Sequence, residues 1–324
     1  MKKLIISIVT LMMLVGCAPI DNTVEETEEP IAIETQEPVS YESLSIISPM
    51  GAPSVSLIRM DINDNNIIEY VSGADLLKAA FVNPTPQYDI ILAPSNLGAL
   101  LAQTEKTTYR MLGVVSWGNL YIVGNDADVL SNPDSKIAIF GEASVPGLVF
   151  EALLKDELAG QYEYYGSVSE AQAALLSGNA DAALIAEPAA TATILTAKSN
   201  DIELLQVADL QELWLEKYGS DGFAQAAVFV SEDAMTNKTE AVKNFEIEIA
   251  SGIEFYADNT NVDQLIEDVD TIGADVLGVP SATIISKTYD GMNLRYIPAN
   301  ECKDALESFL GLFNITDVST YIVE

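Results

Sequence analysis

The 324-residue sequence contains no histidine and only two cysteines, Cys17 and Cys302. The absence of histidine excludes Ser-His and Cys-His nucleophilic centres, imidazole general bases and histidine-ligated metal sites. The glycine-rich P-loop signature that ends in Gly-Lys-Ser/Thr is also missing, so the chain is not expected to hydrolyse ATP itself. Because these catalytic and metal-binding groups are absent, we predict no catalytic residue, no metal and no cofactor.

Positive charge is scarce as well. Lysine and arginine together number 15 against 49 acidic residues, which gives a formal net charge of −34. The only arginines are Arg59, Arg110 and Arg295. A surface with this charge repels nucleic acids and anionic lipid headgroups, and it keeps a secreted protein soluble. We therefore exclude nucleic acid as a partner.

The N-terminus has the pattern of a secretory signal. Lys2 and Lys3 precede an apolar run over residues 4–15, which is too short to span a bilayer as a helix. The run ends in Leu-Val-Gly-Cys, which resembles the bacterial lipobox, where the cysteine is diacylated and becomes the mature N-terminus. We predict a signal peptide over residues 1–16 and a stable lipid anchor on Cys17, which holds the protein outside the cytoplasm at the cell membrane. An ordinary signal peptide with an incidental cysteine is the alternative.

Residues 17–43 contain seven glutamates, three prolines and no lysine or arginine. Low hydrophobicity and like charges cannot offset the entropy lost on ordering, so this segment is predicted to be a disordered acidic tether. Once Cys17 is acylated, Cys302 has no partner for a disulfide. Cys302 lies on an apolar helical stripe, where a small buried side chain is its expected role.

From residue 44 onwards the sequence contains a weak internal repeat. Each copy has three strand-like apolar runs: 44–47, 67–71 and 89–93 in the first, 136–140, 162–165 and 182–186 in the second. The spacing from Pro53 to Pro94 is 41 residues, and that from Pro146 to Pro188 is 42. Unbroken apolar strands that alternate with helices indicate a mostly parallel sheet covered on both faces. Two copies of this unit predict two similar α/β lobes.

The length also favours two lobes, because the roughly 280 residues after the tether exceed what one hydrophobic core usually serves. We expect the chain to cross between the lobes at about residues 124–135 and 219–226. The first lobe would then comprise residues 44–124 with 227–324, and the second lobe residues 125–226. Each lobe is predicted to be a mostly parallel sheet flanked by helices.

Loops at the carboxyl ends of parallel strands form the binding crevice of open α/β sheets. The repeat brings four such loops together: 48–53, 94–96, 141–146 and 187–188. Most of them lead into helix N-termini, whose free N–H groups can bind a ligand, and the turn at 116–119 lies between the lobes. The predicted ligand-binding residues are Met50, Gly51, Pro94, Ser95, Asn96, Trp117, Asn119, Glu142, Ser144, Tyr165 and Glu187.

Several of these residues also have a structural alternative. The serine and asparagine side chains in the loops could serve only as helix N-caps, and Glu187 could cap the helix that follows it. Trp117 could fill the interface between the lobes. Tyr164 and Tyr165 alternate along a strand, so one should pack inward while the other faces the crevice.

Taken together, these motifs resemble type II periplasmic binding proteins of ABC importers. They are the lipobox, Gly-Ala-Pro at 51–53, the apolar run into Pro94, the glycine-led loop 141–146 and Ala-Glu-Pro-Ala at 186–189. The nitrate/sulfonate/taurine and thiamine-precursor (THI5-like) group is the most similar, over about residues 44–320. The resemblance implies a monomeric two-lobe clamp that closes on a small molecule by hinge motion and docks on a permease, with ATP hydrolysed by a separate subunit.

Loop 141–146 is longer and more acidic than in that group, so the ligand does not transfer from the resemblance. None of the arginines, the usual clamp for sulfonate or carboxylate, lies in the four loops. Glu142 and Glu187, with Trp117 and a tyrosine, favour a neutral or cationic planar molecule such as a pyrimidine-type vitamin precursor.

Three alternatives stay open at this point. The ligand could be a sulfonate, taurine or nitrate-type anion, bound in the same transport role. The protein could instead be a lipoprotein that senses its ligand without transporting it. An enzyme of the THI5 or menaquinone-pathway type is the third alternative, but THI5 chemistry depends on histidine and both enzyme types work in the cytoplasm. We therefore predict that the chain is not an enzyme.

Overall fold

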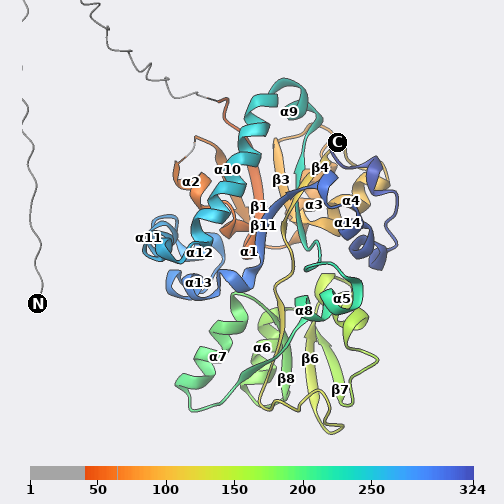
Figure 1. Ribbon diagram of the computed structural model, residues 1–324, viewed down its shortest axis with the longest axis vertical. Coiled ribbons are helices and arrows are strands. Elements are labelled where there is room, and N and C mark those ends of the chain that lie inside the picture. The colour runs from red at the N-terminus through yellow and green to blue at the C-terminus, as the bar shows by residue number, and fades with distance from the viewer. Residues whose placement is uncertain (1–40, 64) are drawn as a thin grey trace, which may run out of the picture. The chain divides into compact units, whose positions relative to one another are not determined.

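The computed structural model describes residues 41–63 and 65–324. The predicted signal peptide, the lipid anchor on Cys17 and nearly all of the predicted tether lie outside these residues. Within the described ranges, no helix combines the length and apolar character that crossing a membrane requires. Residues 41–324 contain two sheets, each flanked by helices (Figure 1).

The first sheet has six strands. Their order across the sheet is β11 (Leu294–Pro298), β4 (Arg110–Ser116), β10 (Ala226–Val230), β3 (Ile90–Pro94), β1 (Ser45–Pro49) and β2 (Ile67–Val71). The strands β2, β1 and β3 pair in parallel, whereas β10 pairs antiparallel with β3 and β4, and β11 pairs antiparallel with β4.

The second sheet has five strands. Their order is β7 (Gln161–Tyr165), β6 (Lys136–Phe140), β8 (Ala182–Ala186), β5 (Leu120–Gly124) and β9 (Leu205–Asp209). Here β7, β6 and β8 pair in parallel, and β5 pairs antiparallel with β8 and β9. The orders β2-β1-β3 and β7-β6-β8 correspond, so the two copies of the sequence repeat form the same three-stranded unit in two sheets.

Helices cover both sheets. Those of the first lobe are α1 (Ala52–Val55), α2 (Ile58–Asn63), α3 (Ala74–Val82), α4 (Ser95–Gln103), α9 (Glu232–Asn237), α10 (Thr239–Ala257), α11 (Val262–Ile272), α12 (Ala274–Leu277), α13 (Ala282–Thr288) and α14 (Lys303–Leu310). Those of the second lobe are α5 (Val145–Leu153), α6 (Val168–Leu176), α7 (Ala189–Ser199) and α8 (Leu210–Tyr218). The structure thus confirms the predicted two-lobe α/β fold. Among the named strands, parallel pairing is confined to the three repeat strands of each sheet.

Burial explains why the central strands read as unbroken apolar runs. Ile91 in β3 packs in the same cluster as Phe81 of α3, whereas its neighbour Ile90 packs on the other face with Phe245 of α10. Successive strand residues point to opposite faces, so a strand covered on both sides needs an apolar residue at every position.

The first crossing between the lobes differs from the predicted position. Residues 120–124 were expected to belong to the first lobe, but β5 pairs with β8 and β9 of the second sheet. The chain therefore crosses between Ser116, where β4 ends, and Leu120. The runs at 111–116 and 120–124 are both mostly apolar and both buried, so hydropathy alone does not indicate which sheet each one joins. The return crossing lies between Tyr218, where α8 ends, and Ala226.

Candidate functional site

A cavity of about 460 Å³ lies between the loops that follow β1 and β3 of the first sheet and β6 of the second. Its lining residues are Pro49, Met50, Pro53, Ala74, Pro94, Asn96, Leu97, Leu100, Phe140, Ala143, Ser144, Val145, Pro146, Gln225 and Ala226. These loops stand at the carboxyl ends of the parallel strands, where α/β folds place ligands. The volume lies within the range of small-molecule sites. We call this space the interlobe cavity.

Four of the predicted site residues line the interlobe cavity: Met50, Pro94, Asn96 and Ser144. Gly51 adjoins it at the start of α1, with a φ of 99° and its N–H donated to the carbonyl of Leu277. The side chain of Ser144 turns back into its own loop, where Oγ donates to the carbonyl of Gly141 at 3.0 Å.

Glu142 and Tyr165 lie beside the interlobe cavity and do not line it. They line a shallower hollow together with Tyr164, Ala143 and Ser144. Tyr164 and Tyr165, the last two residues of β7, are half-buried. Because Tyr164 packs with the α5 face and Tyr165 with the α6 face, the two side chains point to opposite faces of the sheet, as their alternation predicts.

Ser95 and Trp117 are taken up by contacts within the protein. Ser95 is fully buried and its hydroxyl donates to the carbonyl of Ala224. Trp117 is 2% exposed, its Nε1–H donates to the carbonyl of Arg295 at 3.1 Å, and the guanidinium of Arg295 lies over the indole ring. Trp117 therefore packs the junction of the lobes, which is the structural alternative for this residue.

Asn119 and Glu187 belong to a hydrogen-bonded network behind the interlobe cavity. The side-chain amide of Asn119 donates to the carbonyl of Glu187 at 2.8 Å and accepts a hydrogen bond from Nε2 of Gln225, also at 2.8 Å. The Glu187 carboxylate accepts hydrogen bonds from the N–H and the hydroxyl of Thr191, in the first turn of α7. These two hydrogen bonds cap α7. Because Glu187 is also only 7% exposed, its carboxylate is not available to a cationic ligand.

Gln225 is a lining residue that the sequence pattern did not single out. It directly precedes β10, at the end of the return crossing, and its carbonyl accepts a hydrogen bond from the N–H of Ser95. Gln225 follows the glycine-containing stretch Gly219–Gly222 and lies where the chain re-enters the first lobe. That position in the sequence could have identified it as a candidate site residue. Phe140, the last residue of β6, was missed because it reads as an ordinary core position.

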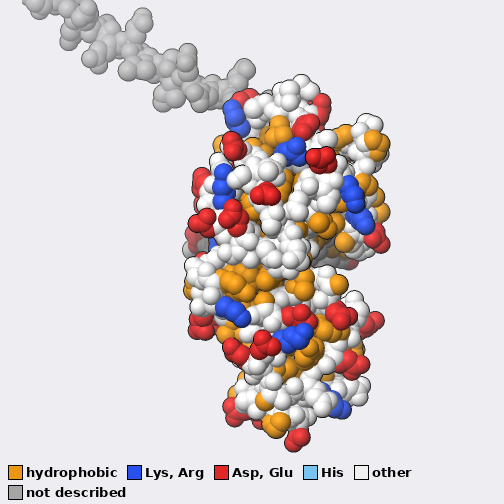
Figure 2. Space-filling model, turned by 90° about the vertical axis from the view of Figure 1, so that its right-hand side faces the viewer, with side chains coloured by type: hydrophobic (Ala, Val, Ile, Leu, Met, Phe, Trp, Pro, Cys, Tyr) orange, Lys and Arg blue, Asp and Glu red, His pale blue; other side chains and the backbone are white. Residues whose placement is uncertain are grey.

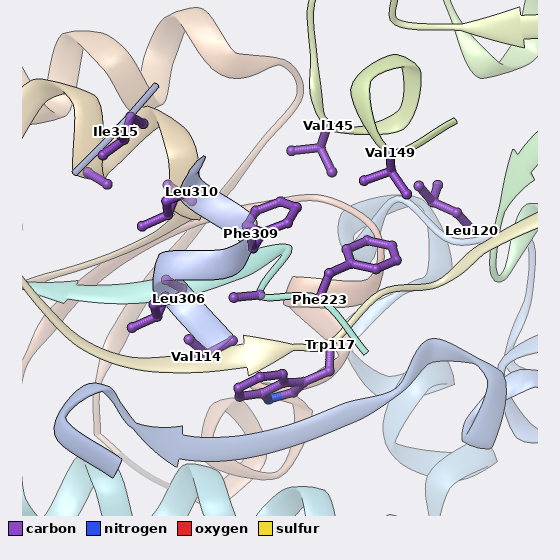
Figure 3. Close-up of a cluster of buried hydrophobic side chains, with 14 of the residues drawn as sticks. Val114, Trp117, Leu120, Val145, Val149, Phe223, Leu306, Phe309, Leu310 and Ile315 are labelled. Carbon is purple, nitrogen blue, oxygen red and sulfur yellow. The ribbon is translucent and has the colours of Figure 1, made fainter. Parts of the chain in front are cut away.

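Aromatic side chains join the two lobes beside the crossings (Figure 3). Phe223 on the return crossing stacks on Phe309 of α14 with ring centroids 5.7 Å apart, and Figure 3 places Leu120 and Val149 of the second lobe on its other side. Trp214 of α8 contacts both phenylalanines. This group, which we call the junction cluster, makes the core continuous from one lobe to the other.

All three arginines have partners away from the interlobe cavity: Arg59 lies over Phe255, Arg110 pairs with Glu232, and Arg295 pairs with Asp221. Among the described residues, no group of three acidic or cysteine side chains is arranged to hold a metal ion. Figure 2 shows acidic side chains spread over both lobes, and hydrophobic side chains gathered at the level where the lobes meet.

We predict that Glu187→Gln raises the melting temperature, and that the gain grows as the pH rises above the usual pKa of a glutamate. Burial raises the pKa of Glu187 above its usual value, although the hydrogen bonds from Thr191 oppose this. Because the pKa is raised, the protonated carboxyl makes its full contribution to the free energy of unfolding below the pKa that Glu187 has in the unfolded chain. That contribution is lost as the pH rises through the pKa of Glu187 in the folded protein. Glutamine is neutral throughout. Melting curves at several pH values test this, and a gain that does not change with pH would contradict it.

Comparison with known proteins yields matches at the level of structure. No protein-family model and no curated protein sequence matches this chain. The fold is similar to an ABC transporter protein from Parabacteroides distasonis, with a TM-score of 0.68 and 20% identity over 87% of this chain and 99% of that one.

Two further solved structures have the same fold. The periplasmic aliphatic sulphonate-binding protein SsuA from Escherichia coli has a TM-score of 0.63 and 16% identity over 88% of this chain and 93% of that one. The ligand-binding component of an ABC-type import system from Staphylococcus aureus has a TM-score of 0.59 and 13% identity over 87% and 96%. At these identities the likeness establishes the two-lobe periplasmic-binding-protein fold.

Proposed function

We propose that this protein is the extracytoplasmic solute-binding component of an ABC importer. It holds a small organic molecule in the interlobe cavity and delivers it to a permease, while a separate subunit hydrolyses ATP. The observation that carries the proposal is the cavity itself, about 460 Å³ in volume, which lies between matching loops of the two repeat halves. The names of the similar solved structures, which are ABC-transporter and sulfonate-binding proteins, support the same role. In this role the protein has no catalytic function.

The crossings between the lobes suit a clamp. Within residues 41–63 and 65–324, the segments between Ser116 and Leu120 and between Tyr218 and Ala226 are the only covalent connections between the lobes. They run side by side, because Phe223 donates its N–H to the carbonyl of Trp117 and Gln225 donates to that of Ser116. Two short paired segments can act as one hinge, and rotation about them would close the loops of the interlobe cavity on a solute.

The lipid anchor is part of this proposal and gives a separate prediction. We expect Cys17→Ser to abolish incorporation of labelled palmitate and to move the protein from the detergent phase to the aqueous phase in Triton X-114 partitioning. The reason is that the acyl chains supply the membrane affinity. Cys302→Ser is the matched control and should leave both readouts unchanged, because Cys302 is buried. Palmitate labelling that persists in Cys17→Ser would contradict the prediction.

Two ligand classes follow from the sequence and the comparisons. A planar neutral or cationic compound, such as a pyrimidine-type vitamin precursor, is the class that the sequence favours through Glu142, Glu187, Trp117 and a tyrosine. A sulfonate is the second candidate, because several similar structures are named as sulfonate-binding proteins. The N-terminus of α4, which has no side-chain cap, offers N–H groups that an anion could use.

Thermal-shift measurements against vitamins, precursors, sulfonates and amines test the proposed function. A solute at about 100 times its dissociation constant adds roughly 2.7 kcal/mol to the free energy of unfolding, which gives a clear rise in melting temperature. Ala143→Trp, which fills the interlobe cavity from an exposed lining position, should abolish the rise. Ala127→Trp, at an exposed loop position of the same lobe, is the control. An equal rise in both variants would refute the cavity as the site.

A further inference from the structure

We infer that the interlobe cavity selects an uncharged solute that donates a hydrogen bond from an N–H or O–H group. This inference rests on the proposed function of the same cavity and defines its ligand class. Of the lining residues within the described part of the chain, none is charged. The only polar side chains among them are Asn96, Ser144 and Gln225. The chemistry of these three groups decides what can bind.

The amide of Gln225 has a fixed orientation. The carbonyl of Glu187 can only accept, so the Asn119 amide must direct its nitrogen there and its oxygen toward Gln225. Gln225 must therefore direct Nε2 toward Asn119, at 2.8 Å. Its Oε1 is left as a buried acceptor without a hydrogen-bond partner in the described residues. An unsatisfied buried acceptor is costly, and a donor on a solute would remove that cost.

A second unsatisfied acceptor lies in the same lobe, next to Ser95, whose N–H donates to the carbonyl of Gln225. Asn96, the second residue of α4, has a buried Oδ1 that no described residue contacts through a hydrogen bond. No neighbouring group fixes this amide, so it can present either its oxygen or its nitrogen to a solute. Asn96 therefore accommodates a donor or an acceptor, whereas Gln225 accommodates a donor only.

Several of the donors around the cavity are used within the protein. In the first turn of α5, Pro146 has no N–H, and Gly147 donates its N–H to the carbonyl of Gly141 at 3.1 Å. The hydroxyl of Ser144 also donates to that carbonyl. At the N-terminus of α4, the N–H of Ser95 donates to the carbonyl of Gln225. An anionic group would enter this site with no positively charged lining residue to offset its desolvation.

The charged residue that adjoins the cavity-lining loop in sequence is acidic. Glu142 is exposed and lines the adjoining hollow, which shares Ala143 and Ser144 with the interlobe cavity. Its carboxylate would repel an anion at the entrance. It remains in water and does not line the cavity, so it does not supply a buried counter-charge for an ammonium group. The arrangement thus disfavours both signs of charge inside.

The test uses pairs of probes that match in size and differ in charge: benzenesulfonamide with benzenesulfonate, nicotinamide with nicotinate, and benzamide with benzylammonium. Equilibrium dialysis with the wild-type protein should show the neutral member bound at least about tenfold more tightly in each pair, which corresponds to about 1.4 kcal/mol. Ala143→Lys should reduce the discrimination against the two anions, since it adds a positive charge to the lining. Ala127→Lys should leave it unchanged.

Ala143→Trp separates failure of this inference from failure of the proposed function. Preference for the neutral probes, lost in Ala143→Trp, supports both. Equal or tighter binding of the charged probes, also lost in Ala143→Trp, would overturn the inference and leave the cavity as the solute site. Binding that Ala143→Trp does not affect would overturn both, because the probes would then occupy another place.

Discussion

Phe309→Ala is expected to lower the free energy of unfolding by about 4 kcal/mol, the largest effect we predict for a single side chain. Phe309 is fully buried in the junction cluster, where it contacts Phe223, Trp214 and Phe313. Truncation removes the apolar contacts of the ring and leaves a cavity at the place where α14 of the first lobe meets α8 of the second. Urea denaturation followed by circular dichroism measures the loss.

Phe313→Ala is the matched control for this variant. Phe313 is half-buried, and the one aromatic ring contact that the structure gives it is with Phe309, at 5.4 Å between centroids. We expect a clearly smaller loss of stability, because less apolar surface returns to water. If both variants lost the same free energy, the junction cluster would not be the element that couples the two lobes.

Gly147→Ala is expected to cost about 3 kcal/mol and also to weaken solute binding. A Cβ atom at this position would lie 2.4 Å from the carbonyl oxygen of Gly141 and 2.8 Å from Cα of Glu142. Both are backbone atoms, so a side-chain rotation cannot relieve the clash. Loop 141–146 would have to move, and this loop supplies Ala143 and Ser144 to the interlobe cavity.

Gly311→Ala provides the comparison for Gly147→Ala. Gly311 has helical dihedral angles, with φ at −57°, and a Cβ there would meet nothing within 4 Å. Alanine should be tolerated or should stabilise the protein by about 0.4–1 kcal/mol, since it restricts the unfolded chain. Denaturation midpoints of both variants check this, and a Gly147→Ala protein as stable as the wild type would show that the loop is not constrained as described.

The sequence was sufficient to predict the fold because burial on both faces leaves a direct signature. The runs 89–93 and 182–186 are apolar at nearly every position, and each becomes a central parallel strand. The matched prolines at 94 and 188 each precede a helix, α4 and α7. The sheet that β5 joins could not be predicted, because strand pairing depends on partners distant in sequence.

The candidate site was predictable in its loops and less so in its side chains. Strand ends locate Met50, Asn96 and Ser144 at one cavity, since parallel strands bring their carboxyl ends together. Whether a loop side chain points outward depends on neighbours that the sequence does not reveal. Trp117 turns toward Arg295, and Glu187 turns toward its own helix. Because of these contacts, both side chains have structural roles and do not line the cavity.

The most direct test of the central claim is hydrogen–deuterium exchange with and without a solute identified by thermal shift. If the solute binds in the interlobe cavity, exchange should slow in three separate segments: residues 50–55, α4 (Ser95–Gln103) and α5 (Val145–Leu153). Protection confined to the hollow beside β6 and β7 and the turn before β8, around Gln161, Tyr162 and Asn179, would contradict the claim.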